Sequence, residues 1–139
     1  MNTVPYVRRA NYYETDQMGV VHHSNYIRWF EEARIDFFRQ HGIDYREMEN
    51  QGIIIPVVDV QCTYKRSVRF DDWMEIHLVM DQYNGVRMCF RYEVRFQKDG
   101  ALAATGHSTH CFIGKYGKPF ALQRVDKTLH AKIKQLSEE

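Results

Sequence analysis

The sequence has no long hydrophobic run, no closely spaced cysteine pair and no excess of charge of one sign. No window approaches the roughly 18 apolar residues of a membrane-spanning helix, and the opening MNTVPYVRRANYYETD lacks the apolar core of a signal peptide. The 19 basic and 18 acidic residues leave a net charge of +1, whereas nucleic-acid binding needs a clustered basic face. We therefore expect a cytoplasmic protein with no membrane span and no nucleic-acid partner.

Potential metal ligands are few and badly spaced. Cys62, Cys89 and Cys111 are far apart and form no CxxC pair, so we expect buried free thiols rather than a disulfide or a zinc site. His107 and His110 lie three apart on a predicted strand, which turns them to opposite faces. These observations predict no metal site, and nothing else in the sequence indicates a cofactor.

Helical periodicity dominates the first third of the chain. The 139 residues fit a single domain over 1–139. The run SNYIRWFEEARIDFFRQHG predicts a long helix, with Ser24 or Asn25 as N-cap and Gly42 as its left-handed stop. Asp44, followed by Glu47, then predicts a short second helix that ends near Gly52. The first helix carries its apolar stripe on Tyr26, Phe30, Ala33 and Phe37.

Strand periodicity follows the helices. A first strand is predicted over 5–12, and alternation with period two predicts four more strands over 58–65, 74–81, 86–97 and 101–114. Asn84-Gly85 and Asp99-Gly100 are dipeptides typical of tight hairpin turns. Val125, Leu129, Ile133 and Leu136 predict a C-terminal helix. The pattern favours an α+β fold in which one apolar helix packs against a largely antiparallel sheet with one buried face.

An acid, a glycine and two histidines precede the long helix in YYETDQMGVVHHSNYIRWFEEAR. The pattern formed by Tyr13, Thr15-Asp16, Gly19, His23 and Tyr26, with YKRSVRFDDWMEI and GHSTHCFIG further on, resembles that of the hotdog-fold acyl-CoA thioesterases. The resemblance is to the 4-hydroxybenzoyl-CoA thioesterase type, including the Tol-Pal-associated bacterial thioesterases. It implies a hotdog fold, in which a curved antiparallel sheet wraps one long central helix.

The resemblance also implies a catalytic centre before this helix. Asp16 is the implied catalytic carboxylate, acting as nucleophile or general base, and His23 is a candidate for orienting water, carbonyl or Asp16. A helix N-terminus presents unpaired amides that suit an oxyanion, so we expect donors in the turn that follows Gly19, from Val21 and His22 to His23. The alternatives are a turn role for Asp16 and a packing role for His23. His22 is expected to be structural or exposed.

Substrate-binding residues are expected on both sides of this centre. The candidates are Tyr13, Tyr26, Tyr64, Lys65 and Arg66, and the cations, with Arg69, Arg87 and Arg91, suit the phosphates of coenzyme A. Solvated strand charges are the alternative for these cations. The resemblance implies a site at a subunit interface of a homodimer or homotetramer, with Tyr64 to Ser67 as the segment expected to reach the facing chain.

Three functions follow from these residues. The first is hydrolysis of a short-chain, medium-chain or aromatic acyl-CoA to the free acid and coenzyme A. The second is a hotdog-type hydratase or dehydratase that acts on acyl thioesters, which needs a different pairing of histidine and carboxylate. The third is an acyl-CoA-binding protein without turnover.

Overall fold

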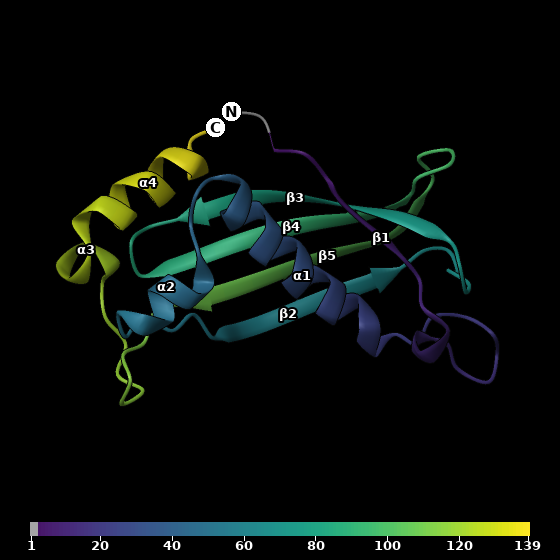
Figure 1. Cartoon of the computed structure of the whole chain (residues 1–139), viewed down its shortest axis with the longest axis horizontal. Coiled ribbons are helices and arrows are strands. Elements are labelled where there is room, and N and C mark those ends of the chain that lie inside the picture. Colours follow the sequence, from purple (N-terminus) through teal and green to yellow (C-terminus); the bar gives the residue numbers. More distant parts are fainter. Residues whose placement is uncertain (1–2) are drawn as a thin grey trace. The chain divides into compact units, whose positions relative to one another are not determined.

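The computed structural model describes residues 3–139, which form one sheet and several helices (Figure 1). The five strands are antiparallel and follow the order β1-β3-β4-β5-β2 across the sheet. They are β1 Tyr6–Arg9, β2 Val57–Tyr64, β3 Trp73–Tyr83, β4 Arg87–Phe96 and β5 Leu102–Cys111. The helices are α1 Ser24–Gln40, α2 Tyr45–Asn50, α3 Leu122–Val125 and α4 Lys127–Ser137, and a 3-10 turn covers Tyr12–Glu14.

The chain divides into two compact units, and β2, β3, β4 and β5 each run from one unit into the other. The first unit holds the chain up to Ile43 with Gln61–Leu78 and Tyr92–Gly106. The second holds Asp44–Val60, Val79–Arg91 and His107–Glu139. The expectation of a single domain over 1–139 stays a prediction.

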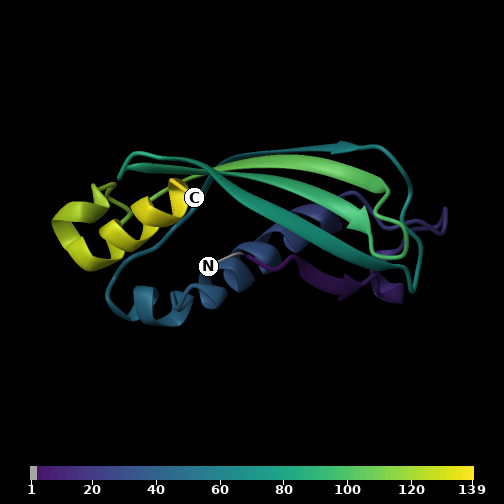
Figure 2. The same ribbon diagram turned by 90° about the horizontal axis from the view of Figure 1, so that it is seen from above.

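In the first unit, α1 lies along one face of the strands (Figure 2). Trp29, Phe30 and Phe38 are fully buried, and the Phe30 ring stacks on Tyr92 of β4 at 4.2 Å between centroids. A Cβ atom at Gly106 of β5 would lie 2.4 Å from the Phe30 ring. Glycine is therefore required at this point, because any side chain would displace the central aromatic ring of the helix.

In the second unit, α3 and α4 supply the apolar cover. Leu122 and Ile133 are fully buried, as are Met88 and Phe90 of β4. The predicted C-terminal helix is interrupted at Asp126, whose carboxylate accepts the Leu129 amide and caps α4. The prediction that one helix would run through Val125 is therefore wrong.

Several predicted element boundaries also differ from the structure. α1 begins at Ser24 with His23 as its cap residue, so neither Ser24 nor Asn25 is the N-cap; instead, the Ser24 amide donates to the imidazole Nδ1 of His22. Gly42 has φ +76°, which confirms the predicted left-handed stop. The first strand is shorter than predicted, because the 3-10 turn begins at Tyr12.

Burial confirms the alternation on β4 but not on β2. Met88, Phe90, Tyr92, Val94 and Phe96 are all buried, whereas Val86, at the predicted start of this strand, precedes β4 and is exposed. On β2, by contrast, Val58 and Tyr64 are exposed, because β2 is an edge strand of the sheet. No helix within residues 3–139 is long and apolar enough to cross a membrane.

Candidate active site

The segment before α1 is a closed loop in the first unit. The Asp16 amide donates to the Val20 carbonyl over 2.9 Å, and the Gly19 amide returns a 2.9 Å bond to the Asp16 carbonyl. Thr15 and Val21 pair as an antiparallel bridge at the loop base. Gly19 has φ +78°, a conformation that side chains other than glycine rarely adopt. The chain therefore forms a tight loop that places Asp16 near the start of α1.

The Asp16 carboxylate is half-buried and only partly engaged. Its Oδ1 accepts the Met18 amide over 2.9 Å, which is the turn role considered from the sequence. The other carboxylate oxygen has no hydrogen-bond partner within residues 3–139. One oxygen thus holds the loop and leaves the second for chemistry.

The backbone amides near the start of α1 are not equally available. The Val21 amide donates to the Val68 carbonyl over 2.7 Å, and the His22 amide donates to the Glu14 carbonyl over 2.8 Å. The Ser24 amide faces the His22 imidazole. The His23 amide has no acceptor among the described residues. The expected oxyanion donors therefore narrow from Val21, His22 and His23 to the amide of His23.

A cleft of about 280 Å³ collects most of the predicted residues. Gly19, His22 and Tyr13 do not line it, and Tyr13 is exposed with its hydroxyl accepting from the Asn11 side chain. The cleft is lined by Asp16, Met18, Val20, Val21, His23, Tyr26, Tyr64, Lys65, Arg66 and Ser67. Tyr64 to Ser67 thus line the cleft of their own chain, and a contribution of this segment to a facing chain stays a prediction.

Two tyrosines form the apolar wall of the cleft. The rings of Tyr26 and Tyr64 meet edge to face at 5.0 Å, and the Tyr64 hydroxyl donates to the His23 carbonyl over 3.1 Å. Burial, with the nearby Cys62 thiol, raises the pKa of Tyr64 to about 12 and also raises that of Tyr26. Both hydroxyls therefore stay protonated at neutral pH, and Tyr64 remains a donor.

The adjacent histidines differ in their contacts. His22 is exposed, and its Nδ1 lies 2.9 Å from the Ser24 hydroxyl, which agrees with the expected structural role. The His23 ring lies 4.0 Å from that of His22 and 6.4 Å from that of Tyr64, measured between centroids. The His23 imidazole forms no hydrogen bond with another described side chain. An orienting role for this ring stays a prediction.

The predicted cations belong to both units. Lys65 and Arg66 line the cleft, and the Arg66 guanidinium lies 4.8 Å from the Phe96 ring centroid. Arg69 belongs to the same unit, and its Nη1 lies 3.6 Å from the position of a Cβ atom on Gly19. Arg87 and Arg91 belong to the second unit. There Arg91 pairs with Asp81 over 3.2 Å, which is the structural role considered from the sequence.

The three cysteines, on β2, β4 and β5, and the buried histidine of β5 form no metal site with the other described residues. Cys62, Cys89 and Cys111 are free, as predicted, although each is only half-buried. His110 is buried and its Nε2 lies 2.8 Å from the Ser108 hydroxyl. Within residues 3–139, no three His, Cys, Asp or Glu side chains gather in a way that could hold a metal ion.

Sequence reasoning missed the most heavily bonded residue beside the cleft. Glu14 is buried, and its carboxylate accepts from Arg8, from the Asn11 amide and from the indole of Trp29. Burial alone would raise the pKa of this carboxyl, but these three donors hold it below its ordinary value. The spacing of Asn11 and Glu14, typical of a capping box, was the available signal.

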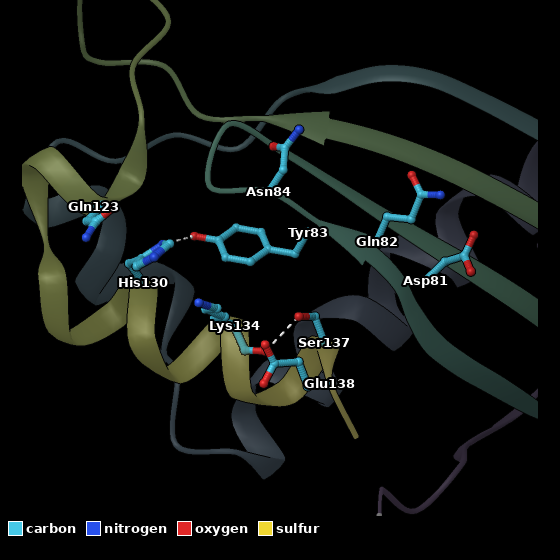
Figure 3. A pocket seen from close by; sticks show the side chains of 9 residues that line it. All are labelled: Asp81, Gln82, Tyr83, Asn84, Gln123, His130, Lys134, Ser137 and Glu138. Atoms are coloured by element: carbon cyan, nitrogen blue, oxygen red, sulfur yellow. Dashed lines mark hydrogen bonds between the residues drawn. The ribbon is translucent and has the colours of Figure 1, made fainter.

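The second unit contains a larger cavity of about 500 Å³, whose lining is shown in Figure 3. The Tyr83 hydroxyl and the His130 Nδ1 face each other across it at 2.7 Å. Burial raises the pKa of Tyr83 to about 12. The lining residues are Asp81, Gln82, Tyr83, Asn84, Gln123, His130, Lys134, Ser137 and Glu138.

The model of the thioesterase-like superfamily matches residues 11–131, which include the whole cleft. The chain belongs to the thioesterase-like superfamily. A superfamily relative from Aquifex aeolicus (strain VF5), provisionally named an esterase, is 41% identical over 81% of this chain and 86% of its own. Another, from Bacillus subtilis (strain 168), is provisionally named acyl-CoA thioesterase YneP and is 32% identical over 87% of this chain and 88% of its own.

Solved thioesterase-like structures share the architecture of the chain. The crystal structure of a DHNA-CoA thioesterase from Staphylococcus aureus superposes with a TM-score of 0.92 at 35% identity, covering 96% of this chain and 90% of that one. The α+β hotdog fold implied by the sequence resemblance is thereby confirmed.

Proposed function

We propose that this thioesterase-like chain hydrolyses acyl-CoA thioesters to the free acid and coenzyme A, in the cleft of the first unit. One observation carries the proposal: a carboxylate with one unengaged oxygen, Asp16, lines the same cleft as His23, whose amide has no acceptor at the start of α1. A nucleophile or base beside an oxyanion donor is the minimum that acyl transfer to water requires. The names of the relatives from B. subtilis and S. aureus support the same chemistry.

Two routes of hydrolysis can use Asp16 and the His23 amide. In the first, the free Asp16 oxygen attacks the thioester carbon, the C–S bond breaks, and water then hydrolyses the mixed anhydride. In the second, Asp16 takes a proton from water, and that water attacks the same carbon while the thiolate leaves and is protonated. In both, negative charge develops on the carbonyl oxygen, where the His23 amide and the dipole of α1 stabilise it.

The substrate is an acyl-CoA whose phosphates contact the basic rim of the cleft. Lys65 and Arg66 supply that rim, and charge-assisted bonds to phosphate oxygens suit both side chains. Tyr26 and Tyr64 offer ring faces and edges to the acyl group. An aromatic acyl group is the preferred candidate, because these rings can pack against it and because a solved relative is named for DHNA-CoA.

A panel of short-chain, medium-chain and aromatic acyl-CoAs, assayed by release of free thiol, tests the proposal. Wild-type protein should release thiol from at least one of them, and Asp16→Asn should do so at least about a thousandfold more slowly, although its far-UV spectrum stays unchanged. Hydration of a crotonyl thioester without thiol release would favour the hydratase alternative. Binding without any turnover would favour the non-catalytic one.

Labelling tests for the anhydride route. A single turnover in heavy-oxygen water places label in the Asp16 carboxylate if an anhydride forms and water attacks at the aspartyl carbon. The general-base route leaves all the label in the product acid. Mass spectrometry of the peptide that contains Asp16 reads the difference.

The proposed assembly is a homodimer, or a tetramer of two dimers, joined along β2. This strand lies at the edge of the sheet, and Val57 and Val58 on it are 47% and 44% exposed. An edge strand with exposed apolar residues is a template for pairing with another chain. Sedimentation should give a dimer or larger species for the wild type and a smaller one for Val58→Lys; a monomeric wild type would contradict the assembly.

A further inference from the structure

Glu14 is a buried carboxylate that neither proposed hydrolytic route uses. Only 3% of its surface is exposed. Oε1 accepts from Arg8 Nη1 at 2.6 Å and from the Asn11 amide at 2.8 Å, and Oε2 accepts from the Trp29 indole at 2.8 Å. A buried charge is retained only where partners satisfy it, and here they come from β1, the cap residue of the 3-10 turn and α1.

The backbone carbonyl of Glu14 accepts two further hydrogen bonds, and both come from residues beside the proposed oxyanion donor. It accepts the His22 amide at 2.8 Å and the Asn25 side-chain amide at 2.9 Å. His22 and Asn25 flank the His23 peptide on either side. Asn25 is itself buried, and its amide nitrogen also lies 3.3 Å from the His22 carbonyl. The Glu14 carbonyl therefore holds the backbone at His22, just before the His23 amide, and Asn25 in the first turn of α1, just after it.

Glu14 is also two residues from Asp16, at the base of the same loop. The bridge between Thr15 and Val21 continues directly from the bond between the Glu14 carbonyl and the His22 amide. The loop thus has two closures in sequence, at 15 with 21 and at 14 with 22. Glu14 thus ties the segment that leads to Asp16 to the segment that carries the His23 amide, and loss of its contacts would let these two groups move relative to each other.

A second acid, Glu32 of α1, holds Arg8, the partner of Glu14, in place. Arg8 donates from Nε to Glu32 of α1 over 2.9 Å, and Tyr6 donates to the same carboxylate oxygen over 3.0 Å. The Arg8 guanidinium lies 4.8 Å from the centroid of Trp29. Arg8 is therefore held against α1 by contacts of its own and cannot easily follow a displaced Glu14.

We propose that Glu14 is a positioning residue that sets the distance between the free Asp16 oxygen and the His23 amide, an inference that rests on the proposed thioesterase function. It touches no reacting atom. Glu14 acts instead on the positions of the Asp16 oxygen and the His23 amide, and a displacement of such groups by about 1 Å can lower the rate on the order of a hundredfold.

The test is a double-mutant cycle in steady-state thiol release. Glu14→Gln keeps the size of the side chain but removes its charge and one acceptor. We expect kcat to fall about 10- to 100-fold with little change in KM, because Tyr64, Lys65 and Arg66 are untouched. In an Asp16→Asn background the same change should alter the residual kcat by less than about twofold, because residues that act through one another are non-additive.

Two further variants keep the test decisive. If Glu14→Gln does not fold, Trp29→Phe takes its place, because it removes the indole donor to Glu14 but keeps an aromatic ring. It should lower kcat by several-fold, with the same non-additivity toward Asp16→Asn. Tyr92→Phe is the matched control, since it removes the hydrogen bond from Arg34 of α1 to a buried hydroxyl elsewhere in the first unit. It should lower the melting temperature and leave kcat unchanged.

The outcomes separate this proposal from the one on which it depends. A wild-type protein that releases no thiol from any acyl-CoA overturns both. A wild-type protein that is active, with Glu14→Gln and Trp29→Phe leaving kcat unchanged, overturns the positioning role alone. The same result follows if the loss appears in KM only, or is equally large with Asp16 and with Asn at position 16.

Discussion

The cavity of the second unit has a volume of about 500 Å³ and the cleft of the first about 280 Å³, yet their polar groups are arranged very differently. In the larger cavity, Tyr83 and His130 face each other at 2.7 Å, and the Asp81 carboxylate pairs with Arg91. In the smaller cleft, one Asp16 oxygen and the His23 amide have no partner among the described residues. Groups that are satisfied by each other hold structure, whereas unsatisfied groups that line one cleft can act on a ligand.

Local backbone direction adds to this contrast. The cleft lies at the N-terminus of α1, a helix of 17 residues, whose dipole places partial positive charge there. On its helical side, the larger cavity is lined instead by Lys134 and Ser137 near the C-terminus of α4 and by the C-cap residue Glu138. A developing oxyanion is stabilised by the first arrangement and not by the second. Chemistry is therefore expected in the smaller space.

The largest expected effect comes from a matched pair of aspartates. Asp16→Asn should lower kcat/KM by about a thousandfold or more, because it removes the nucleophile or base, whereas Asp81→Asn should leave thiol release unchanged. Steady-state kinetics on the best acyl-CoA gives both values. A large loss in Asp81→Asn with little loss in Asp16→Asn would reverse the assignment of the two spaces.

A smaller effect is expected from the cations. Lys65→Ala and Arg66→Ala should each raise KM by about tenfold with kcat nearly constant, as expected for loss of a charge-assisted bond to phosphate. Added salt should weaken substrate binding to the wild type more than to either variant. Lys134→Ala in the larger cavity is the control and should change neither parameter. A fall in kcat alone would place the cations in the chemical step instead.

A pair of tyrosines sharpens the comparison further. Tyr64→Phe and Tyr83→Phe each remove one hydrogen bond, and each should cost about 0.5 to 1.5 kcal/mol of unfolding free energy. Only Tyr64→Phe should also lower kcat, by several-fold, because its hydroxyl holds the His23 carbonyl. Urea unfolding and kinetics on the same preparations separate the two effects. Equal kcat values in the two variants would remove Tyr64 from the organisation of the site.

The smallest effect is a pH dependence of stability in the first unit. Because the pKa of Glu14 is lower in the folded than in the unfolded chain, the unfolded state binds more protons in acid. The stabilisation is fully present above the unfolded value, about 4.3, and is lost as pH falls through the lower folded value. Urea unfolding from pH 6 to pH 3 should show a shallower loss in Glu14→Gln than in the wild type. Parallel curves would contradict this.

Periodicity in the sequence predicted the elements well where burial decides them. The stripe of α1 and the alternation of β4 are predictable because each apolar residue faces the core. The burial of the edge strand and the ends of the helices were less predictable. Val58 continues the alternation of β2 but is exposed in the single chain, and Asp126 divides the C-terminal helix by capping α4.

The site divides in the same way. Asp16, Gly19 and His23 could be singled out from a local pattern, because the turn and helix start are encoded within a few residues. The hydrogen bond that already engages the Val21 amide could not be predicted in this way, since its acceptor, the Val68 carbonyl, comes from a distant segment. Glu14 was missed for the same reason: its donors Arg8 and Trp29 belong to β1 and α1.

Chemical-shift mapping with a non-hydrolysable acyl-CoA analogue, in which a methylene group separates sulfur from the carbonyl, tests the central proposal most directly. If the cleft of the first unit binds the carbonyl, the amide of His23 should shift most, followed by amides near Asp16 and Ser67. Amides near Tyr83 and His130 should stay in place. Largest shifts around Tyr83 and His130, with an unmoved His23 amide, would contradict the proposed site.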